Sequence, residues 1–277
     1  MSGDFQKRTP LTRTDLAREV RAIGVEPGQI VMLHTRLSAL GYVIGGADAV
    51  LLALQEVLSP SGTLIALASW DHAPPDDDRG WSTAVREAYL RDPPAFDVAV
   101  SACARYVGRM PERIRTWPGA CRSDHPEASF VALGARASWL TEDQPIDHSY
   151  GPGSPLSKVV DKKGAILMLG APLETITMLH YAEELADVQN KRRVHYVAPV
   201  LTPEGVQWRE IDDIDTSRGA FPYEDVVGDR DGFEVIAEEA LAAGIGREAA
   251  IGESRSVLFP AGGLVTFAVD WMEERFP

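Results

Sequence analysis

The chain has 277 residues, of which 45% are hydrophobic and 25% are charged. This composition is typical of a soluble globular protein, and the length suits one large α/β domain. The 27 basic and 41 acidic residues give a net charge of −14, which argues against nucleic acid or an anionic membrane as a partner and is compatible with a cationic ligand. Cys103 and Cys121 have neither metal-type spacing nor a disulfide framework to join.

The first elements in chain order predict a parallel sheet. A short amphipathic helix at 12–23 ends at Gly24, and apolar runs at 30–34 and 63–68 are typical of buried strands on either side of a helix at 47–58. A strand–loop–helix–strand unit of this kind forms a parallel βαβ connection. No apolar signal segment opens the chain and no run of about 18 apolar residues occurs, so we expect a cytoplasmic protein.

The later elements complete a mixed architecture. We predict the following elements: a helix at 100–115, strands at 130–133 and 165–170, a helix around His180, an antiparallel hairpin at 193–201 and 206–211, and helices at 233–241 and 264–276. Segments 73–95 and 212–230 are expected to be irregular insertions. The fold class is therefore α/β, with a mixed, largely parallel sheet flanked by helices, a C-terminal antiparallel hairpin, and a single domain over 1–277.

The segment from Thr177 to Glu184 carries the strongest chemical signal. At about 100° per residue, His180 and Glu183 lie together at the edge of an apolar helical arc, with Glu184 beside them. Because residues three apart on a helix are neighbours, Glu183 can fix the tautomer of the imidazole and stabilise its protonated form, which is what a general base needs. The alternative is a surface helix with salt bridges and no catalytic role.

Two loops after predicted strands indicate ligand binding. Thr35, Ser38 and the glycines that follow them offer hydroxyls and backbone N–H groups, which suit a phosphate group. Ser69, Trp70 and Asp71 end the second strand, at the sheet edge where ligands of open α/β sheets bind.

Several stretches, in order along the chain, resemble the aminoglycoside N(3)-acetyltransferase family. They are Leu33-His-Thr-Arg-Leu-Ser-Ala-Leu-Gly41, Ala68-Ser-Trp-Asp71, Ala95-Phe-Asp97, Arg122-Ser-Asp-His-Pro-Glu-Ala-Ser129, Leu169-Gly-Ala-Pro172 and Leu179-His-Tyr-Ala-Glu183. The resemblance implies an α/β fold distinct from that of the Gcn5-related acetyltransferases. It also implies direct transfer of acetyl from acetyl-CoA to an amine of the 2-deoxystreptamine ring of an aminoglycoside, which would confer antibiotic resistance.

The resemblance also assigns residues. It makes His180 the catalytic base and Glu183 its partner. The residues expected to hold coenzyme A are His34, Thr35, Arg36, Leu37, Ser38, Arg122, Ser123 and His125. Those expected to contact the polycationic acceptor are Ser69, Trp70, Asp71, Asp97, Glu184, Asp213 and Asp215. No metal is expected. The chain departs from the family at Thr216-Ser-Arg-Gly219, where a Ser-Asn-Gly run is usual.

Four alternatives stay open at this point. The enzyme could acetylate a different amine, or the chain could sequester the drug without catalysis. A metal-dependent hydrolase using His180, Glu183, His125 and Asp124 is a third. His125 could also replace His180 as the base, or simply order its loop. For each predicted acceptor aspartate taken singly, a role in a turn or a helix cap is as good a prediction as contact with the substrate. The sequence is also compatible with either a monomer or a homodimer.

Overall fold

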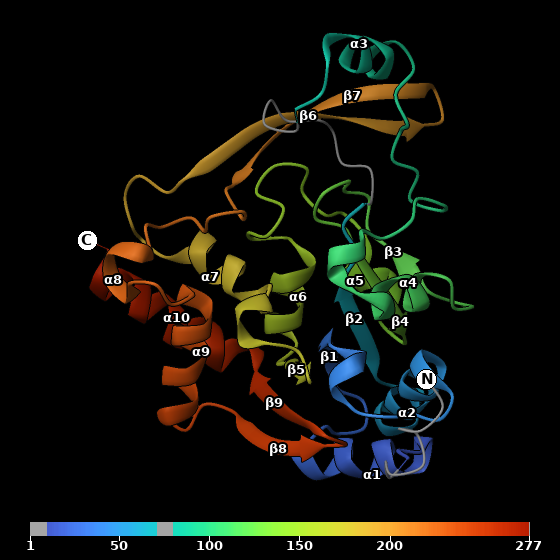
Figure 1. Ribbon diagram of the computed structural model, residues 1–277, viewed down its shortest axis with the longest axis vertical. Coiled ribbons are helices and arrows are strands. Elements are labelled where there is room, and N and C mark those ends of the chain that lie inside the picture. Colours follow the sequence, from blue (N-terminus) through green and yellow to red (C-terminus); the bar gives the residue numbers. More distant parts are fainter. Residues whose placement is uncertain (1–9, 71–79, 277) are drawn as a thin grey trace.

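A computed structural model describes residues 10–70 and 80–276 (Figure 1). Its centre is a seven-stranded sheet in the order β3-β4-β2-β1-β5-β9-β8. The strands are β1 (Ile30–Thr35), β2 (Thr63–Leu67), β3 (Cys121–Arg122), β4 (Phe130–Gly134), β5 (Ala165–Leu169), β8 (Arg247–Ile251) and β9 (Ser254–Pro260). β1 pairs in parallel with β2 and β5, and antiparallel strands extend the sheet on both sides. The predicted mixed α/β fold is confirmed.

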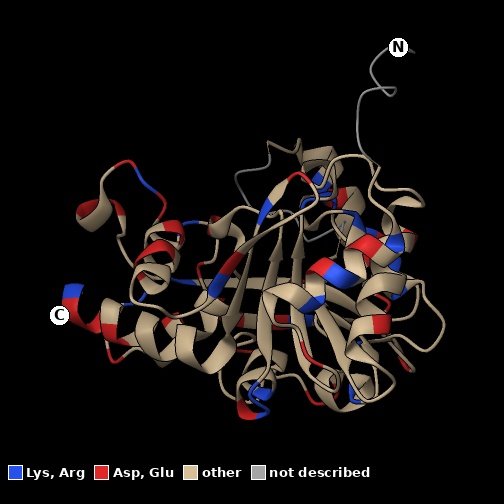
Figure 2. Ribbon diagram, turned by 90° about the horizontal axis from the view of Figure 1, so that it is seen from below, with Lys and Arg blue, Asp and Glu red and all other residues tan. Residues whose placement is uncertain are grey.

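Helices cover both faces of this sheet. On one face lie α5 (Ala137–Thr141), α6 (Pro155–Asp161), α7 (Met178–Leu185), α9 (Gly232–Ala242) and α10 (Ala261–Arg275). On the other lie α1 (Arg13–Ile23), α2 (Gly46–Leu58) and α4 (Arg109–Arg115). Along β1, Met32 packs with the core on the α7 and α10 side of the sheet, whereas Val31 and Leu33 pack with the core on the α1 and α2 side. Strands that are buried on both faces have sequences that are continuously apolar. Figure 2 shows that the charged residues lie mainly on the surrounding helices and loops.

Short sequence signals define several helix ends. Thr12 and Asp15 form a capping box at the start of α1, and Gly24 ends that helix in the left-handed conformation. Ser154 caps α6 ahead of a proline in its first turn, and Asp231 caps α9. No helix within the described ranges has the length and apolar character needed to cross a bilayer.

The predicted hairpin, β6 (Arg193–Thr202) and β7 (Gly205–Ile214), forms a separate two-stranded sheet. In Figure 1 it lies across the top of the molecule, and α3 (Thr83–Arg91) lies against its outer end. The rings of Tyr89 and Trp208 meet edge to face there, with centroids 6.0 Å apart. Phe96 forms a short bridge to Val200 and ties the hairpin to the body of the molecule.

Some predicted elements differ from the structure. β8 and β9 were not predicted, because Arg247-Glu-Ala-Ala-Ile251 is rich in residues that are common in helices. Two segments that were expected to be irregular contain α3 and the short helix α8 (Glu224–Val227). The helix predicted at 100–115 is only α4 and the turn η4 (Arg105–Val107). The first part of the predicted insertion at 73–95 lies outside the described residues up to position 79.

Candidate active site

A cleft of about 640 Å³ opens at the carboxyl ends of the parallel strands. Three segments at strand ends line it: Leu33–Ser38 at the end of β1, Leu67 and Ser69 at the end of β2, and most of the residues from Ala171 to Thr177 after β5. His180 of α7 also faces the cleft, together with Tyr106–Pro111 from the η4–α4 region. This is the edge at which open α/β sheets bind ligands, as the sequence predicted.

His180 and Glu183 form a hydrogen-bonded pair within this cleft. Their spacing on α7 places the Nδ1 atom of His180 2.7 Å from the Oε2 atom of Glu183. The Glu183 side chain is fully buried, whereas 14% of the His180 side chain is exposed. A proton on Nδ1 satisfies the carboxylate and leaves the lone pair of Nε2 available to accept a proton.

Aromatic rings and buried donors fix the pair in place. The imidazole lies between the rings of Tyr150 and Phe233, with centroid distances of 5.2 and 4.9 Å. The second carboxylate oxygen of Glu183 accepts from the backbone N–H of Ala220 at 2.8 Å and from the hydroxyl of Tyr223 at 2.9 Å. A buried charge is tolerated when its oxygens are hydrogen-bonded in this way. None of these four residues was predicted, because they come from loops and a distant helix and share no local pattern with His180.

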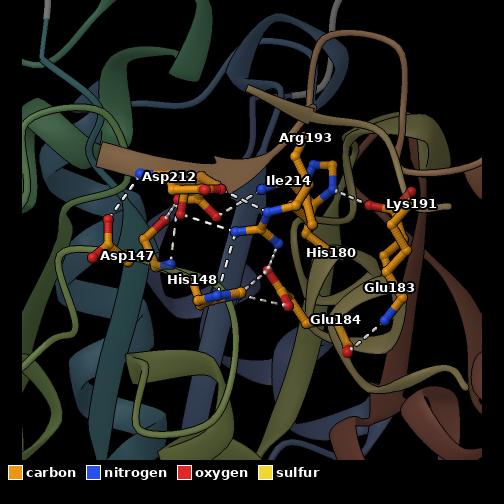
Figure 3. Close-up of polar contacts among 11 residues, drawn as sticks. Asp147, His148, His180, Glu183, Glu184, Lys191, Arg193, Asp212 and Ile214 are labelled. Carbon is orange, nitrogen blue, oxygen red and sulfur yellow. Dashed lines mark hydrogen bonds and ion pairs between the residues drawn. The ribbon is translucent and has the colours of Figure 1, made fainter. Parts of the chain in front are cut away.

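One helical turn further on, Glu184 belongs to a charged cluster (Figure 3). His148 Nδ1 lies 3.2 Å from its Oε2 atom, and Arg193 lies 3.8 Å from its Oε1 atom. Arg193 also bonds Asp212 at 2.6 Å. The cluster therefore joins α7 to the base of the hairpin. His148 has a φ of 55°, a left-handed conformation that is strained for a non-glycine residue, and its N–H donates to the Asp212 carbonyl.

Three residues that line the cleft each bury a side-chain polar atom that has no hydrogen-bond partner among the described residues: His34 Nε2, Thr35 Oγ1 and Ser69 Oγ. Burial lowers the pKa of His34 to about 4, so the imidazole is neutral near pH 7. Leaving such atoms unsatisfied costs about 1–3 kcal/mol each. A bound molecule with amide or carbonyl groups would satisfy them, which fits a pantetheine arm.

The turn from Arg122 to His125 does not line this cleft. His125 is buried, its Nδ1 accepts from the Ala128 N–H at 2.8 Å, and its Nε2 lies 3.1 Å from the Ile146 carbonyl. Burial lowers its pKa to about 4. Ser123 is buried and accepts from the backbone N–H of Phe130.

The Arg122 guanidinium is also engaged within the protein. It donates to the Ala68 carbonyl at 2.5 Å and to the Ser101 carbonyl, and it stacks on the Phe96 ring. Arg122, Ser123 and His125 thus bond within the protein, and their contact with coenzyme A stays a prediction. These contacts order the turn, and the alternative that His125 is the base gains no support from its burial away from the cleft.

The predicted acceptor residues are dispersed. Ser69 lines the cleft, whereas Trp70 is buried against Phe96 and Asp97 caps its own turn through the Ala99 N–H. Asp71 lies outside the described residues.

The two aspartates at the end of the hairpin differ in exposure. Asp213 is 3% exposed and accepts from the Ser149 hydroxyl, the Ser149 N–H and the Ile214 N–H, while burial raises its pKa. It therefore holds the Ser149 loop, and its contact with the acceptor stays a prediction. Asp215 is half-buried and bonds Ser217 at 2.9 and 2.5 Å.

The metal-hydrolase alternative finds no support in this geometry. Among the described residues, no group of three or more His, Cys, Asp or Glu side chains could hold a metal ion. His180, Glu183, His125 and Asp124 therefore do not form a ligand set.

Residues 32–273 match the family model described as aminoglycoside 3-N-acetyltransferase. The chain belongs to this family. It is 46% identical to the aminoglycoside N(3)-acetyltransferase VII of Streptomyces paromomycinus, over 96% of this chain and 93% of that protein.

Two solved structures of acetyltransferases share the fold. The crystal structure of the aminoglycoside acetyltransferase AAC(3)-Xa has a TM-score of 0.94 and 46% identity, over 96% of this chain and 94% of that one. The binary complex of AAC-IIIb with coenzyme A has a TM-score of 0.88 and 41% identity, over 97% and 98% of the two chains. The family resemblance inferred from the motifs is thus confirmed.

Proposed function

We propose that this chain is an aminoglycoside 3-N-acetyltransferase, which transfers acetyl from acetyl-CoA to an amine of the 2-deoxystreptamine ring and so confers resistance. The observation that carries the proposal is the His180–Glu183 pair facing a cleft in a member of this family. The AAC-IIIb complex with coenzyme A supports acetyl-CoA as the cosubstrate.

His180 is the general base in this proposal. An ammonium group has no free lone pair, so a base must take its proton before the nitrogen can attack a thioester. Nε2 of His180 takes this proton, and the imidazolium that forms is stabilised by the carboxylate of Glu183 on its other side. The acetyl group then passes from sulfur to nitrogen, and the thiolate leaves.

The cofactor side of the cleft is the segment His34–Ser38. It begins with the last two residues of β1, His34 and Thr35, whose buried polar atoms find no partner among the described residues. Arg36 and Ser38 are exposed there, and Leu37 contributes apolar surface. These residues offer hydrogen bonds and a positive charge to coenzyme A.

In this proposal, Glu184 and Asp215, which precedes the cleft residue Thr216, bind the remaining amino groups of the acceptor. Glu184 lies one helical turn from His180, and Asp215 follows the hairpin. Placing the carboxylates away from the reacting nitrogen is important, because an adjacent negative charge favours the protonated amine.

The test is mass spectrometry of gentamicin, tobramycin and apramycin after incubation with acetyl-CoA and the enzyme. We expect one acetyl group on the deoxystreptamine ring and an equal amount of free coenzyme A. Coenzyme A release with other amines but with none of these drugs would favour a different acceptor. Drug binding without any release would show a sequestering protein.

A further inference from the structure

The carboxylate of Glu183 has a partner from a distant loop. The hydroxyl of Tyr223 donates to Oε1 at 2.9 Å, on the side of the carboxylate away from His180. Tyr223 is 6% exposed, so this hydrogen bond is shielded from solvent. A buried hydrogen bond to a charged group contributes more than an exposed one, and its loss leaves the charge under-satisfied.

Two glycines leave the space that the ring of Tyr223 occupies. A Cβ atom on Gly219 would lie 2.7 Å from Cε2 of the ring, and one on Gly232 would lie 2.3 Å from Cδ1. Gly219 also has a φ of 77°, which favours glycine. Neither position can carry a side chain without displacing the ring. The backbone around Tyr223 is therefore built to admit this side chain at this place.

The same ring connects to the base by a second route. Tyr223 packs edge to face on Phe233, with centroids 5.9 Å apart, and Phe233 packs edge to face on His180. Tyr223 thus contacts two of the groups that hold the imidazole, namely the carboxylate of Glu183 and the ring of Phe233.

We propose that Tyr223 is a positioning residue for acetyl transfer, whose hydroxyl fixes Glu183 so that the carboxylate holds His180 in the orientation and tautomer needed to accept a proton. This inference rests on the proposed role of His180 as the base. Burial, and after it the charge of Glu183, raises the pKa of Tyr223 well above its usual range. The phenol therefore stays protonated and remains a donor at every pH at which the enzyme works.

The first experiment removes only the hydroxyl. In Tyr223→Phe the ring still fills its place between the glycines, but Glu183 loses one donor. We expect kcat to fall roughly tenfold, with the KM values for acetyl-CoA and for tobramycin within about twofold of the parent. The matched control is Tyr181→Phe, because Tyr181 is a buried tyrosine on α7 outside this network, and it should keep the parent kcat.

A double-mutant cycle separates positioning from general stabilisation. If Tyr223 acts through Glu183, adding Tyr223→Phe to Glu183→Gln should cost little further activity. A tyrosine that merely stabilises the fold would lower kcat by the same factor in both backgrounds, and that result would overturn the proposal. Gly232→Ala is the second variant, because the three atoms nearest to its added Cβ all belong to Tyr223; it displaces the ring, keeps the hydroxyl and should reproduce the loss of kcat at unchanged KM.

The outcomes also separate this inference from the proposed function. A parent enzyme that releases no coenzyme A with any amine would refute the function. An active parent that is disabled by His180→Ala but not by Tyr223→Phe would refute only the role of Tyr223.

Discussion

The Nδ1 atom of His180 lies 2.7 Å from the Oε2 atom of Glu183, and the carboxylate is fully buried behind the imidazole. The pair is therefore assembled before any substrate binds. Because buried protein groups already hold the carboxylate, little reorganisation is needed when the imidazole becomes charged.

His180→Ala should lower turnover by about 10²- to 10⁴-fold, the usual contribution of a general base. Glu183→Gln should cost less, because the base remains while its orientation and charge stabilisation weaken. Steady-state kinetics with acetyl-CoA and tobramycin measure both effects. His195→Ala, on the exposed side of the hairpin, is the control and should keep the parent rate. If His180→Ala retained most of its turnover in a folded protein, another group would be the base.

Replacing both Thr35 and Ser38 with Ala should raise the KM for acetyl-CoA more than the KM for the drug. The two hydroxyls lie on the cleft at the end of β1, where we place the cofactor. The loss of two neutral hydrogen bonds corresponds to roughly tenfold. Ser61→Ala, at the opposite end of β2, serves as the control. A change confined to the drug KM would move the cofactor elsewhere in the cleft.

The apparent affinity for the aminoglycoside should fall as ionic strength rises, because salt screens the attraction between a polycation and carboxylates. Asp215→Asn should weaken drug binding by up to about 1 kcal/mol, or fivefold, and make the salt dependence shallower. Asp213→Asn is the matched comparison. Asp213 is buried and bonds Ser149, so its change should lower the melting temperature and leave the salt slope intact. Equal slopes in the parent and Asp215→Asn would remove Asp215 from the acceptor site.

The stability of the fold should decline between about pH 6.5 and pH 4 in part because of His125. Its folded-state pKa is lowered to about 4 by burial, whereas in the unfolded chain the imidazole takes up a proton near its ordinary pKa. Within this window the unfolded state binds more protons than the folded state. The free energy of unfolding therefore decreases as the pH is lowered, by up to about 1.4 kcal/mol per pH unit.

Urea unfolding at a series of pH values measures this slope. His125→Gln removes the titrating group, so its slope should be shallower than that of the parent. His34 and Asp213 also titrate, but they do so in both proteins and cancel in the comparison. Identical slopes would show that His125 gains its proton without cost in the folded state.

Local patterns in the sequence predicted the parts of the site that lie within one element. His180 and Glu183 are three residues apart on one helix, and Thr35 and Ser38 lie at and just beyond the end of one strand. Tyr223 reaches Glu183 across 40 positions, from a segment predicted to be irregular, so no periodicity reveals it. The role of His125 depends on complete burial, which its polar neighbours in the sequence do not indicate.

The strands of the fold, like the site residues, were predicted where the pattern lies within a single element. β1, β2 and β5 were recognised from the sequence as apolar runs, because helices bury these strands on both faces of the sheet. β8 lies at the edge of the sheet and is mostly exposed, so it lacks the apolar pattern that marks a strand. Its place in the sheet is determined by pairing with β9 rather than by its own composition.

The two ends of the β6–β7 hairpin have different surroundings. Its base is tied to Glu184 through Arg193, while its outer end contacts α3, far along the strands from the cleft. His180 and its supports belong to the body of the molecule. We expect substitutions at the hairpin base to act on acceptor binding through Glu184, because Arg193 pairs with Glu184 whereas Glu183 bonds His180. Variation in one peripheral element would then change the accepted amine while the buried His180–Glu183 pair stays as it is.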